Sequence, residues 1–364
     1  MRQRVDAAIE AAGGWLPFDR FMAMALYEPG LGYYANHSAK FGHLPAGQGG
    51  GGSDFVTAPE LTPLFGRTLA LQIAQALQAT GTDEIWEFGA GTGALALQVL
   101  DALAGMGVAI KRYTIVDLSG SLRERQRTTL AAHGDTVQWA QTLPDSLNGV
   151  VLGNEVLDAM PVQLLARVGG VWHERGVVLD GAGELAFGDT PTALRPPVEV
   201  PGGHDYLCEI HPQGEAFVRT LAERWTRGAA FFIDYGFPEA EYYHPQRHMG
   251  TLMCHRAHQS DSNPLLALGE KDITAHVNFT GVALAAQQAG LEVLGYASQG
   301  RFLINCGLID LATAASARDN ALMQKLVNEH EMGELFKVLA LAPAAGAADW
   351  VPLGFAHGDR THSL

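Results

Sequence analysis

Apolar residues recur along the chain with two periods, and each period predicts a different kind of element. Between residues 83 and 165, short apolar runs alternate with amphipathic stretches of helical length, in the order β-α-β-α-β-β. This alternation predicts an α/β fold, a mostly parallel sheet with helices on its faces. The predicted strands are Ile85–Phe88, Tyr113–Val116, Val137–Trp139 and Val150–Gly153, followed later by Ala230–Gly236, Leu291–Tyr296 and Leu335–Leu341.

The N-terminal residues predict helices rather than strands. Val5–Ala12 and Phe18–Leu26 are two short helical patterns, and a third follows Pro63 and stops at Gly81. The first 36 residues are either a packed lobe or a lid over a site, and the pattern leaves both open. Before the third helix, the glycine run Gly47–Ser53 cannot bury surface and therefore predicts a flexible loop.

Two later segments interrupt the α/β pattern. Residues 166–213 contain the apolar runs Val171–Glu174 and Gly176–Leu179, separated by glycines, which predict hairpins in an inserted β-rich lobe. Residues 237–280 are irregular and polar and contain several histidines. We therefore expect four parts: a helical or lid segment (1–80), an α/β core (81–165), the β-rich lobe (166–213), and the rest of the core (214–364) with a substrate-side insertion at 237–280.

Composition narrows the kind of partner. The 364 residues are 47% hydrophobic, which is enough for a large core. The sequence contains no run of about 18 apolar residues, so no membrane span is predicted. The net charge of −15 argues against a nucleic-acid partner and is compatible with a basic protein or a small cation. Three widely spaced cysteines and no apolar leader predict a cytoplasmic protein without disulfides.

One stretch joins the first predicted strand to the next helix: Glu87-Phe88-Gly89-Ala90-Gly91-Thr92-Gly93. Glycines allow a tight turn whose N–H groups approach a bound molecule closely. With Ala94 these glycines fit a dinucleotide fingerprint, and they also fit the E-x-G-x-G-x-G loop that binds S-adenosylmethionine in class I methyltransferases. Asp117, at the end of the second predicted strand, could accept hydrogen bonds from the ribose hydroxyls of either cofactor. The alternative is that its carboxylate only caps the following helix. Glu87 favours S-adenosylmethionine, because a carboxylate repels a pyrophosphate and attracts an ammonium or a sulfonium.

A second cluster, Asn154-Glu155-Val156-Leu157-Asp158, follows the fourth predicted strand. If this segment is helical, Glu155 and Asp158 lie on one face. Two carboxylates beside a cofactor suit a guanidinium, which they would bind through bidentate hydrogen bonds and orient. The alternative is that both only stabilise a helix N-terminus electrostatically. The histidines lack the spacing of zinc ligands, so no metal site is predicted.

Several separated motifs, in a fixed order from about Phe21 to Phe355, resemble one family. This family is the MidA-type class I methyltransferases, which are related to a mitochondrial complex I assembly factor that methylates arginine. Besides the two clusters above, the motifs are Leu26-Tyr27-x-Pro29-x-x-Gly32-Tyr33-Tyr34, Asp54-Phe55-Val56-Thr57-Ala58-Pro59-Glu60, Asp234-Tyr235-Gly236, Gly250-Thr251-Leu252 and Asp272-Ile273-Thr274-Ala275-His276-Val277-x-Phe279.

The resemblance implies a Rossmann-like, seven-stranded sheet with S-adenosylmethionine over the ends of strands one, two and four. It implies that Asn154, Glu155 and Asp158 lie near the transferred methyl group, and that His258 occupies the place of a histidine of the family. The expected catalytic residues are Glu155, Asp158 and His258. Three positions depart from the family: Ser53 stands for Gly, Asp117 for Glu and His255 for Tyr, and the last could alter the acceptor. The expected cofactor contacts are Thr57, Pro59, Glu60, Glu87, Gly89, Ala90, Gly91, Gly93, Asp117, Leu118 and Asn154.

The leading hypothesis is a methyltransferase that acts on an arginine of a protein substrate, by resemblance a subunit of a respiratory complex. One alternative is a non-catalytic assembly or binding protein, because a fold does not fix a function. Another is an NAD-dependent oxidoreductase, which Glu87 and the cluster Asn154–Asp158 disfavour.

Overall fold

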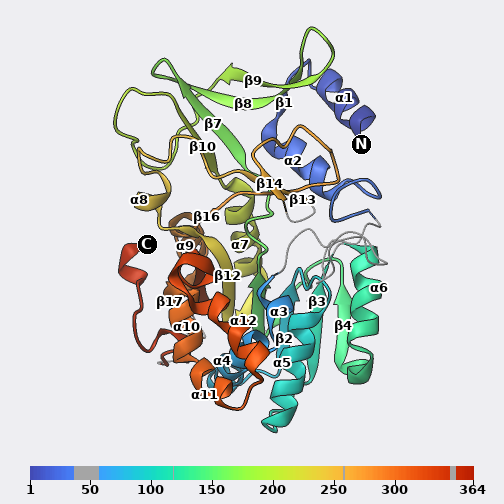
Figure 1. The fold of residues 1–364 in the computed structure, drawn as a ribbon, viewed down its shortest axis with the longest axis vertical. Coiled ribbons are helices and arrows are strands. Elements are labelled where there is room, and N and C mark those ends of the chain that lie inside the picture. Colours follow the sequence, from blue (N-terminus) through green and yellow to red (C-terminus); the bar gives the residue numbers. More distant parts are fainter. Residues whose placement is uncertain (37–56, 118, 257–258, 345–349) are drawn as a thin grey trace.

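The computed structural model describes residues 1–36, 57–117, 119–256, 259–344 and 350–364. These residues form two lobes, an α/β lobe at the bottom of Figure 1 and a β-rich lobe at its top. The predicted loop Gly47–Ser53 and the predicted site residues Leu118 and His258 lie outside the described residues.

The α/β lobe is built on a mixed seven-stranded sheet with the strand order β17-β18-β12-β6-β2-β3-β4. Five neighbouring strands run parallel, in the order β12-β6-β2-β3-β4, and β18 is antiparallel to both of its neighbours. Their bounds are β2 Glu84–Phe88, β3 Arg112–Val116, β4 Val137–Ala140, β6 Val150–Asn154, β12 Ala230–Phe237, β17 Leu291–Ser298 and β18 Phe336–Pro343. The predicted α/β fold and its seven strands are confirmed.

Helices cover both faces of this sheet, because its strands are apolar on both sides (Figure 1). In β2, Ile85 joins the apolar cluster on one face, and Trp86 and Phe88 join the cluster on the other. The first face is covered by α4 (Leu64–Thr80), α5 (Ala94–Gly105), α10 (Gln299–Asn305), α11 (Leu308–Thr313) and α12 (Ala317–Val327). The second face is covered by α7 (Pro212–Arg224) and α9 (Phe279–Gln288).

The β-rich lobe is an antiparallel sheet of the order β1-β8-β7-β10, with β9 paired to β8. One detail of the prediction is wrong: the two runs around Gly176 form a single strand rather than a hairpin. Gly176 marks a close approach instead, since a Cβ there would lie 2.4 Å from the carbonyl oxygen of Leu16. The bounds are β1 Leu16–Pro17, β7 Gln163–Val168, β8 Val171–Leu179, β9 Leu185–Pro191 and β10 Tyr206–Ile210, with α1 (Arg2–Ala11) and α2 (Phe18–Tyr27) packed beside them.

Residues 237–280, predicted to be irregular, carry short elements at the junction of the two lobes (Figure 1). Three of them form an antiparallel sheet of the order β14-β13-β15, and β16 extends the main sheet beside β12. The bounds are α8 Glu239–Tyr242, β13 Met253–Arg256, β14 Gln259–Asp261, β15 Asp272–Thr274 and β16 Val277–Asn278. The remaining elements are α3 Ala58–Leu61, α6 Gly120–Thr129 and a parallel pair, β5 Leu147–Asn148 and β11 Trp225–Arg227.

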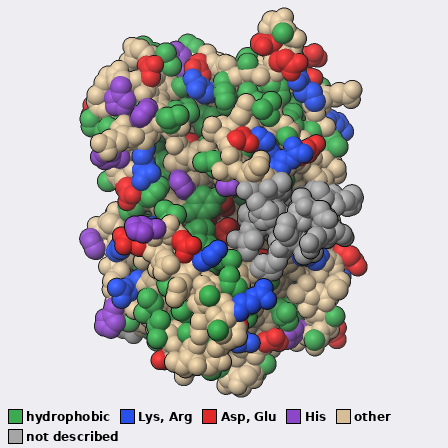
Figure 2. Space-filling view, in the orientation of Figure 1, with side chains coloured by type: hydrophobic (Ala, Val, Ile, Leu, Met, Phe, Trp, Pro, Cys, Tyr) green, Lys and Arg blue, Asp and Glu red, His purple; other side chains and the backbone are tan. Residues whose placement is uncertain are grey.

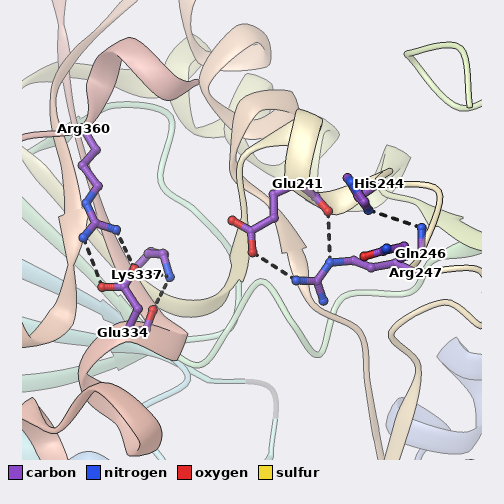
Figure 3. A network of polar contacts seen from close by, with 7 residues as sticks. All are labelled: Glu241, His244, Gln246, Arg247, Glu334, Lys337 and Arg360. Carbon is purple, nitrogen blue, oxygen red and sulfur yellow. Dashed lines mark hydrogen bonds and ion pairs between the residues drawn. The ribbon is translucent and has the colours of Figure 1, made fainter.

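The C-terminal segment is attached to the start of β18 by ionic contacts (Figure 3). Arg360 Nη2 donates to Glu334 Oε2 at 3.1 Å, and Lys337 Nζ donates to the carbonyl oxygen of Glu334. Within the described ranges, no helix combines the length and apolar character needed to cross a bilayer. The three cysteines are buried and free.

Candidate active site

A cavity of about 1150 Å³ lies at the carboxyl ends of β2, β3 and β6, between the two lobes. Figure 2 shows it as a hollow at mid-height, where hydrophobic and acidic side chains meet. Sites for one drug-sized molecule usually measure about 300–1,000 Å³. This cavity therefore has room for a cofactor and part of a second molecule.

Most of the predicted cofactor contacts line this cavity. The predicted residues on its wall are Thr57, Pro59, Glu60, Glu87, Gly89, Ala90, Gly91, Asp117 and Asn154. Gly93 is the exception among the described residues, because it turns the chain into α5 with φ 85° without lining the cavity. Both predicted carboxylates, Glu155 and Asp158, lie on the wall as well.

The glycine loop is bent at Gly89, whose φ of 62° is in the left-handed region. A Cβ at this position would lie 3.1 Å from Val156 Cγ2, so a larger residue would be both strained and crowded. The loop is also tied to α3, because Thr92 Oγ1 donates to Glu60. These contacts place the N–H groups of the loop and the predicted segment Thr57–Glu60 on one wall.

The two acids at the ends of β2 and β3 are held by specific donors. Glu87 is 2% exposed and accepts a hydrogen bond of 2.7 Å from the Tyr113 hydroxyl. Burial raises the pKa of Glu87 to about 7, and the charge of Asp117 adds to this shift. Asp117 accepts from the Ser119 N–H and from Gln126 Nε2, both at 2.8 Å. A cation bound near Glu87 would favour its charged form.

The cluster Asn154–Asp158 is not helical, so the condition under which its two carboxylates would share a helix face is not met. The chain makes a turn in which Glu155 has φ 54°, an unusual value for a residue with a side chain. Asp234 stabilises this turn: its Oδ2 accepts from the N–H groups of Val156, Leu157 and Asp158 at 3.1, 2.9 and 3.3 Å. A side chain of the neighbouring strand β12 therefore stabilises the shape of the turn that follows β6.

The turn presents buried acceptors to the cavity. Asn154 Oδ1 and Asp158 Oδ1 are buried and have no hydrogen-bond partner among the described residues. Asp158 Oδ2 accepts from the Tyr235 hydroxyl at 2.6 Å, and Glu155 Oε1 accepts from Asn154 Nδ2 at 3.0 Å. Such orphan acceptors are costly unless a ligand supplies donors.

Carboxyl groups are crowded in this part of the cavity. Burial raises the pKa of Glu155 to about 8, and repulsion from Asp158 contributes to this shift. Burial also raises the pKa of the Asp158 and Asp234 carboxyls. In the part of the chain that the structure describes, no Lys or Arg forms an ion pair with Glu155 or Asp158. The site is therefore suited to a cation.

The opposite wall combines the N-terminal segment with the insertion. Tyr27 and Tyr34 line the cavity, so the N-terminal residues are both a packed lobe and part of the cover of the site. From the insertion, the lining residues are Thr251, Met253, His255, Asp272, Thr274 and His276. Burial lowers the pKa of His276 to about 4, and the positive charges of Arg247 and Lys337 add to this, so its imidazole is neutral at pH 7. Figure 3 shows Arg247 and Lys337 but not His276.

Three polar residues of the site were not among the predicted contacts. Asp234 lies within β12 directly after the apolar run Ala230–Ile233, and an acid after an apolar run is the signal that identified Asp117. Asp272 begins β15 after Glu270 and Lys271, so that signal does not apply to it. Gln126, in the polar helix α6, donates to both Asp117 Oδ2 and the Gly91 carbonyl oxygen. Nothing in the sequence pattern of α6 distinguishes Gln126 from the other polar residues of this helix. Among the described residues, no group of three or more His, Cys, Asp or Glu is arranged to bind a metal.

The strand order, the glycine loop and the acids at the strand ends define a class I methyltransferase fold. Residues 68–297 match a family model described as "Putative S-adenosyl-L-methionine-dependent methyltransferase", and the chain belongs to this family. The resemblance inferred from the sequence motifs is confirmed.

Two solved structures from Burkholderia thailandensis are similar over the whole chain. One, a superfamily member bound to S-adenosyl-homocysteine, is 48% identical with a TM-score of 0.93 and covers 100% of this chain and 96% of its own. The other, a native structure, is 47% identical with a TM-score of 0.89 and the same coverage. S-adenosyl-homocysteine is what S-adenosylmethionine becomes after methyl transfer, so the predicted cofactor is the one that this family uses.

The curated relatives are more distant. The mitochondrial protein arginine methyltransferase NDUFAF7 of Mus musculus is 28% identical over 89% of this chain and 80% of its own length. The Homo sapiens protein of the same name is 28% identical over 89% of this chain and 79% of its own.

Proposed function

We propose that this chain methylates an arginine guanidinium of a protein substrate with S-adenosylmethionine. The observation that carries the proposal is the turn after β6, which presents two buried carboxylates, Glu155 and Asp158, beside the glycine loop and without a basic partner among the described residues. The names of the distant relatives support the same acceptor. The free, buried cysteines support a reducing compartment such as the cytoplasm.

The residues of the cavity wall that contains the glycine loop fit the proposed cofactor. Gly89 leaves space where a Cβ would be crowded, and Asn154 Oδ1 is a buried acceptor without a partner in the described residues. Asp117, held at the end of β3, suits a pair of ribose hydroxyls. Glu87, beside the loop, suits the ammonium group.

The residues of the turn would bind and orient the acceptor. When bound, S-adenosylmethionine would supply a methyl group on a sulfonium: the C–S electron pair would remain on sulfur as the attacking guanidinium nitrogen forms the N–C bond and loses one proton. Glu155 and Asp158 accept hydrogen bonds from the guanidinium and direct one nitrogen toward the glycine loop. Glu155 accepts that proton in this proposal, because the charge of the bound guanidinium favours the ionised form of a carboxyl whose pKa burial raises in the free site.

Two measurements on the purified protein test this proposal. We expect S-adenosyl-homocysteine to bind in calorimetry, and labelled methyl groups to appear on arginine in a protein of a lysate that lacks this gene. Glu155→Gln should reduce transfer at least about 100-fold, because it removes a charge from the acceptor site. Glu292→Gln, the same change at an exposed position of β17, is the matched control and should leave transfer unchanged.

Each result has a distinct meaning. Absence of binding of S-adenosyl-homocysteine would contradict the proposed activity altogether. Binding without transfer to any protein would favour a non-catalytic binding protein, and transfer to another residue type would contradict the guanidinium acceptor.

A further inference from the structure

A third carboxylate lies on the wall of the cavity opposite the glycine loop. Asp272 begins β15, is 1% exposed and lines the cavity. The strand that carries it is attached to the turn after β6, because the Ala275 N–H donates to the Asp158 carbonyl oxygen at 3.0 Å. The Asp272 charge contributes to the raised pKa of Glu155. Asp272 is therefore close enough to act on the same bound cation as Glu155 and Asp158.

The N-terminal segment fixes the orientation of this carboxylate. The Tyr34 hydroxyl donates to both Asp272 oxygens, at 2.9 and 2.8 Å. Its ring stacks on Tyr27 at 5.6 Å, and the Tyr27 hydroxyl donates to the Ala159 carbonyl oxygen at 2.7 Å. Burial raises the pKa of both tyrosines, so both hydroxyls stay protonated and donate. Tyr34 thus positions Asp272, and Tyr27 fastens the pair to the end of the turn.

Carboxylates on two sides of one cavity discriminate between cations of different shape. A guanidinium is planar, carries five N–H donors directed along several edges and keeps its charge at all relevant pH values. An ammonium is a compact point charge on a single carbon stem. Glu155 and Asp158 reach the cavity from the turn after β6 and Asp272 reaches it from β15, so carboxylates from two separate segments line the cavity and can meet donors on more than one edge of a planar group.

We propose that Asp272 determines the specificity of the acceptor site for a guanidinium over an ammonium. Its carboxylate accepts hydrogen bonds from the guanidinium nitrogen that points away from the methyl donor. Glu155 and Asp158 hold the nitrogen that is methylated, and Tyr34 is a positioning residue that acts through Asp272. This inference rests on the proposed function, and it adds the residue that selects the acceptor.

The test measures binding of small cations to protein saturated with S-adenosyl-homocysteine. Ethylguanidinium and butylammonium are titrated by calorimetry into the wild type, Asp272→Asn and Tyr34→Phe. We expect the wild type to prefer ethylguanidinium, and Asp272→Asn to weaken ethylguanidinium at least about tenfold while butylammonium changes less than about threefold. Tyr34→Phe removes only a hydroxyl and should weaken ethylguanidinium several-fold with no change in affinity for S-adenosyl-homocysteine.

The controls separate this inference from the proposed function. Asp135→Asn makes the same charge change at an exposed position far from the cavity lining and should behave as the wild type. If Asp272→Asn fails to fold, Tyr34→Phe alone decides. Wild-type affinity for ethylguanidinium in both variants would overturn the role of Asp272 and leave the proposed function standing. A wild type that binds S-adenosyl-homocysteine but neither cation would instead count against the guanidinium acceptor and against this inference with it.

Discussion

At the scale of the single residue, Glu155 combines three unfavourable features in one position. Its backbone has a positive φ, its carboxyl is buried, and Asp158 and Asp272 repel its charge. Strain and unpaired charge of this kind usually persist where function requires them. The free protein is therefore expected to be less stable with Glu155 than with a neutral residue of the same shape.

Glu155→Gln should make the free protein more stable at pH 8. Because the pKa of Glu155 is about 8 in the folded state and 4.5 for an ordinary glutamate, the folded state keeps a proton that the unfolded state releases. The stability due to that proton is complete below about pH 4.5 and is lost as the pH rises through about 8. Glutamine avoids this loss, which is at most on the order of 4 kcal/mol.

Thermal unfolding of the wild type and Glu155→Gln, followed from pH 5 to pH 8.5, checks this prediction. The difference in Tm should grow with pH and favour the variant, at about 2 °C or more for each kcal/mol. Glu292→Gln, at an exposed position, should show no such trend. A constant difference across this pH range would mean that Glu155 does not titrate as proposed.

At the scale of the element, the strands were predictable and the turn after β6 was not. The strands of the main sheet are short runs rich in apolar residues, such as Ile85–Phe88 between Glu84 and Gly89, and this pattern predicts their burial. The turn depends on Asp234, which is 79 residues away from Glu155 in the sequence. Its carboxylate accepts hydrogen bonds from the N–H groups of the three residues that follow Glu155. No local pattern contains that contact, so the sequence left the shape of this segment open, although Glu155 and Asp158 do lie on the cavity wall.

The glycine loop offers a second prediction at this scale. Gly89→Ala should weaken binding of S-adenosyl-homocysteine at least about tenfold, because a Cβ would be strained at φ 62° and would crowd Val156. Gly105→Ala is the matched control: it ends α5, and a Cβ there meets nothing within 4 Å. This variant should bind as the wild type and be slightly more stable, by about 0.5–1 kcal/mol. Calorimetry and thermal unfolding measure both effects, and equal affinities of the two variants would show that the loop tolerates a side chain.

At the scale of the whole molecule, the cavity joins parts that are far apart in the sequence. One wall comes from the α/β lobe, and the other from the N-terminal segment and the insertion between the lobes. Residues 27–34 have only a few backbone hydrogen bonds to α2, among them Tyr33 N–H to the Ala25 carbonyl oxygen at 2.8 Å. A ligand that fills both walls should therefore stabilise this segment beyond the effect of the cofactor alone.

Hydrogen exchange of the wild type distinguishes the contributions of the two ligands. We expect S-adenosyl-homocysteine alone to slow exchange in Phe88–Ala94, and addition of ethylguanidinium to slow it in residues 27–34 as well, because Tyr34 holds the carboxylate that the cation contacts. The β8–β9 hairpin contributes nothing to the cavity lining and should exchange at the same rate in all three states. Protection that spreads equally to this hairpin would indicate general stabilisation. Protection confined to the glycine loop would mean that the N-terminal segment does not close on the acceptor.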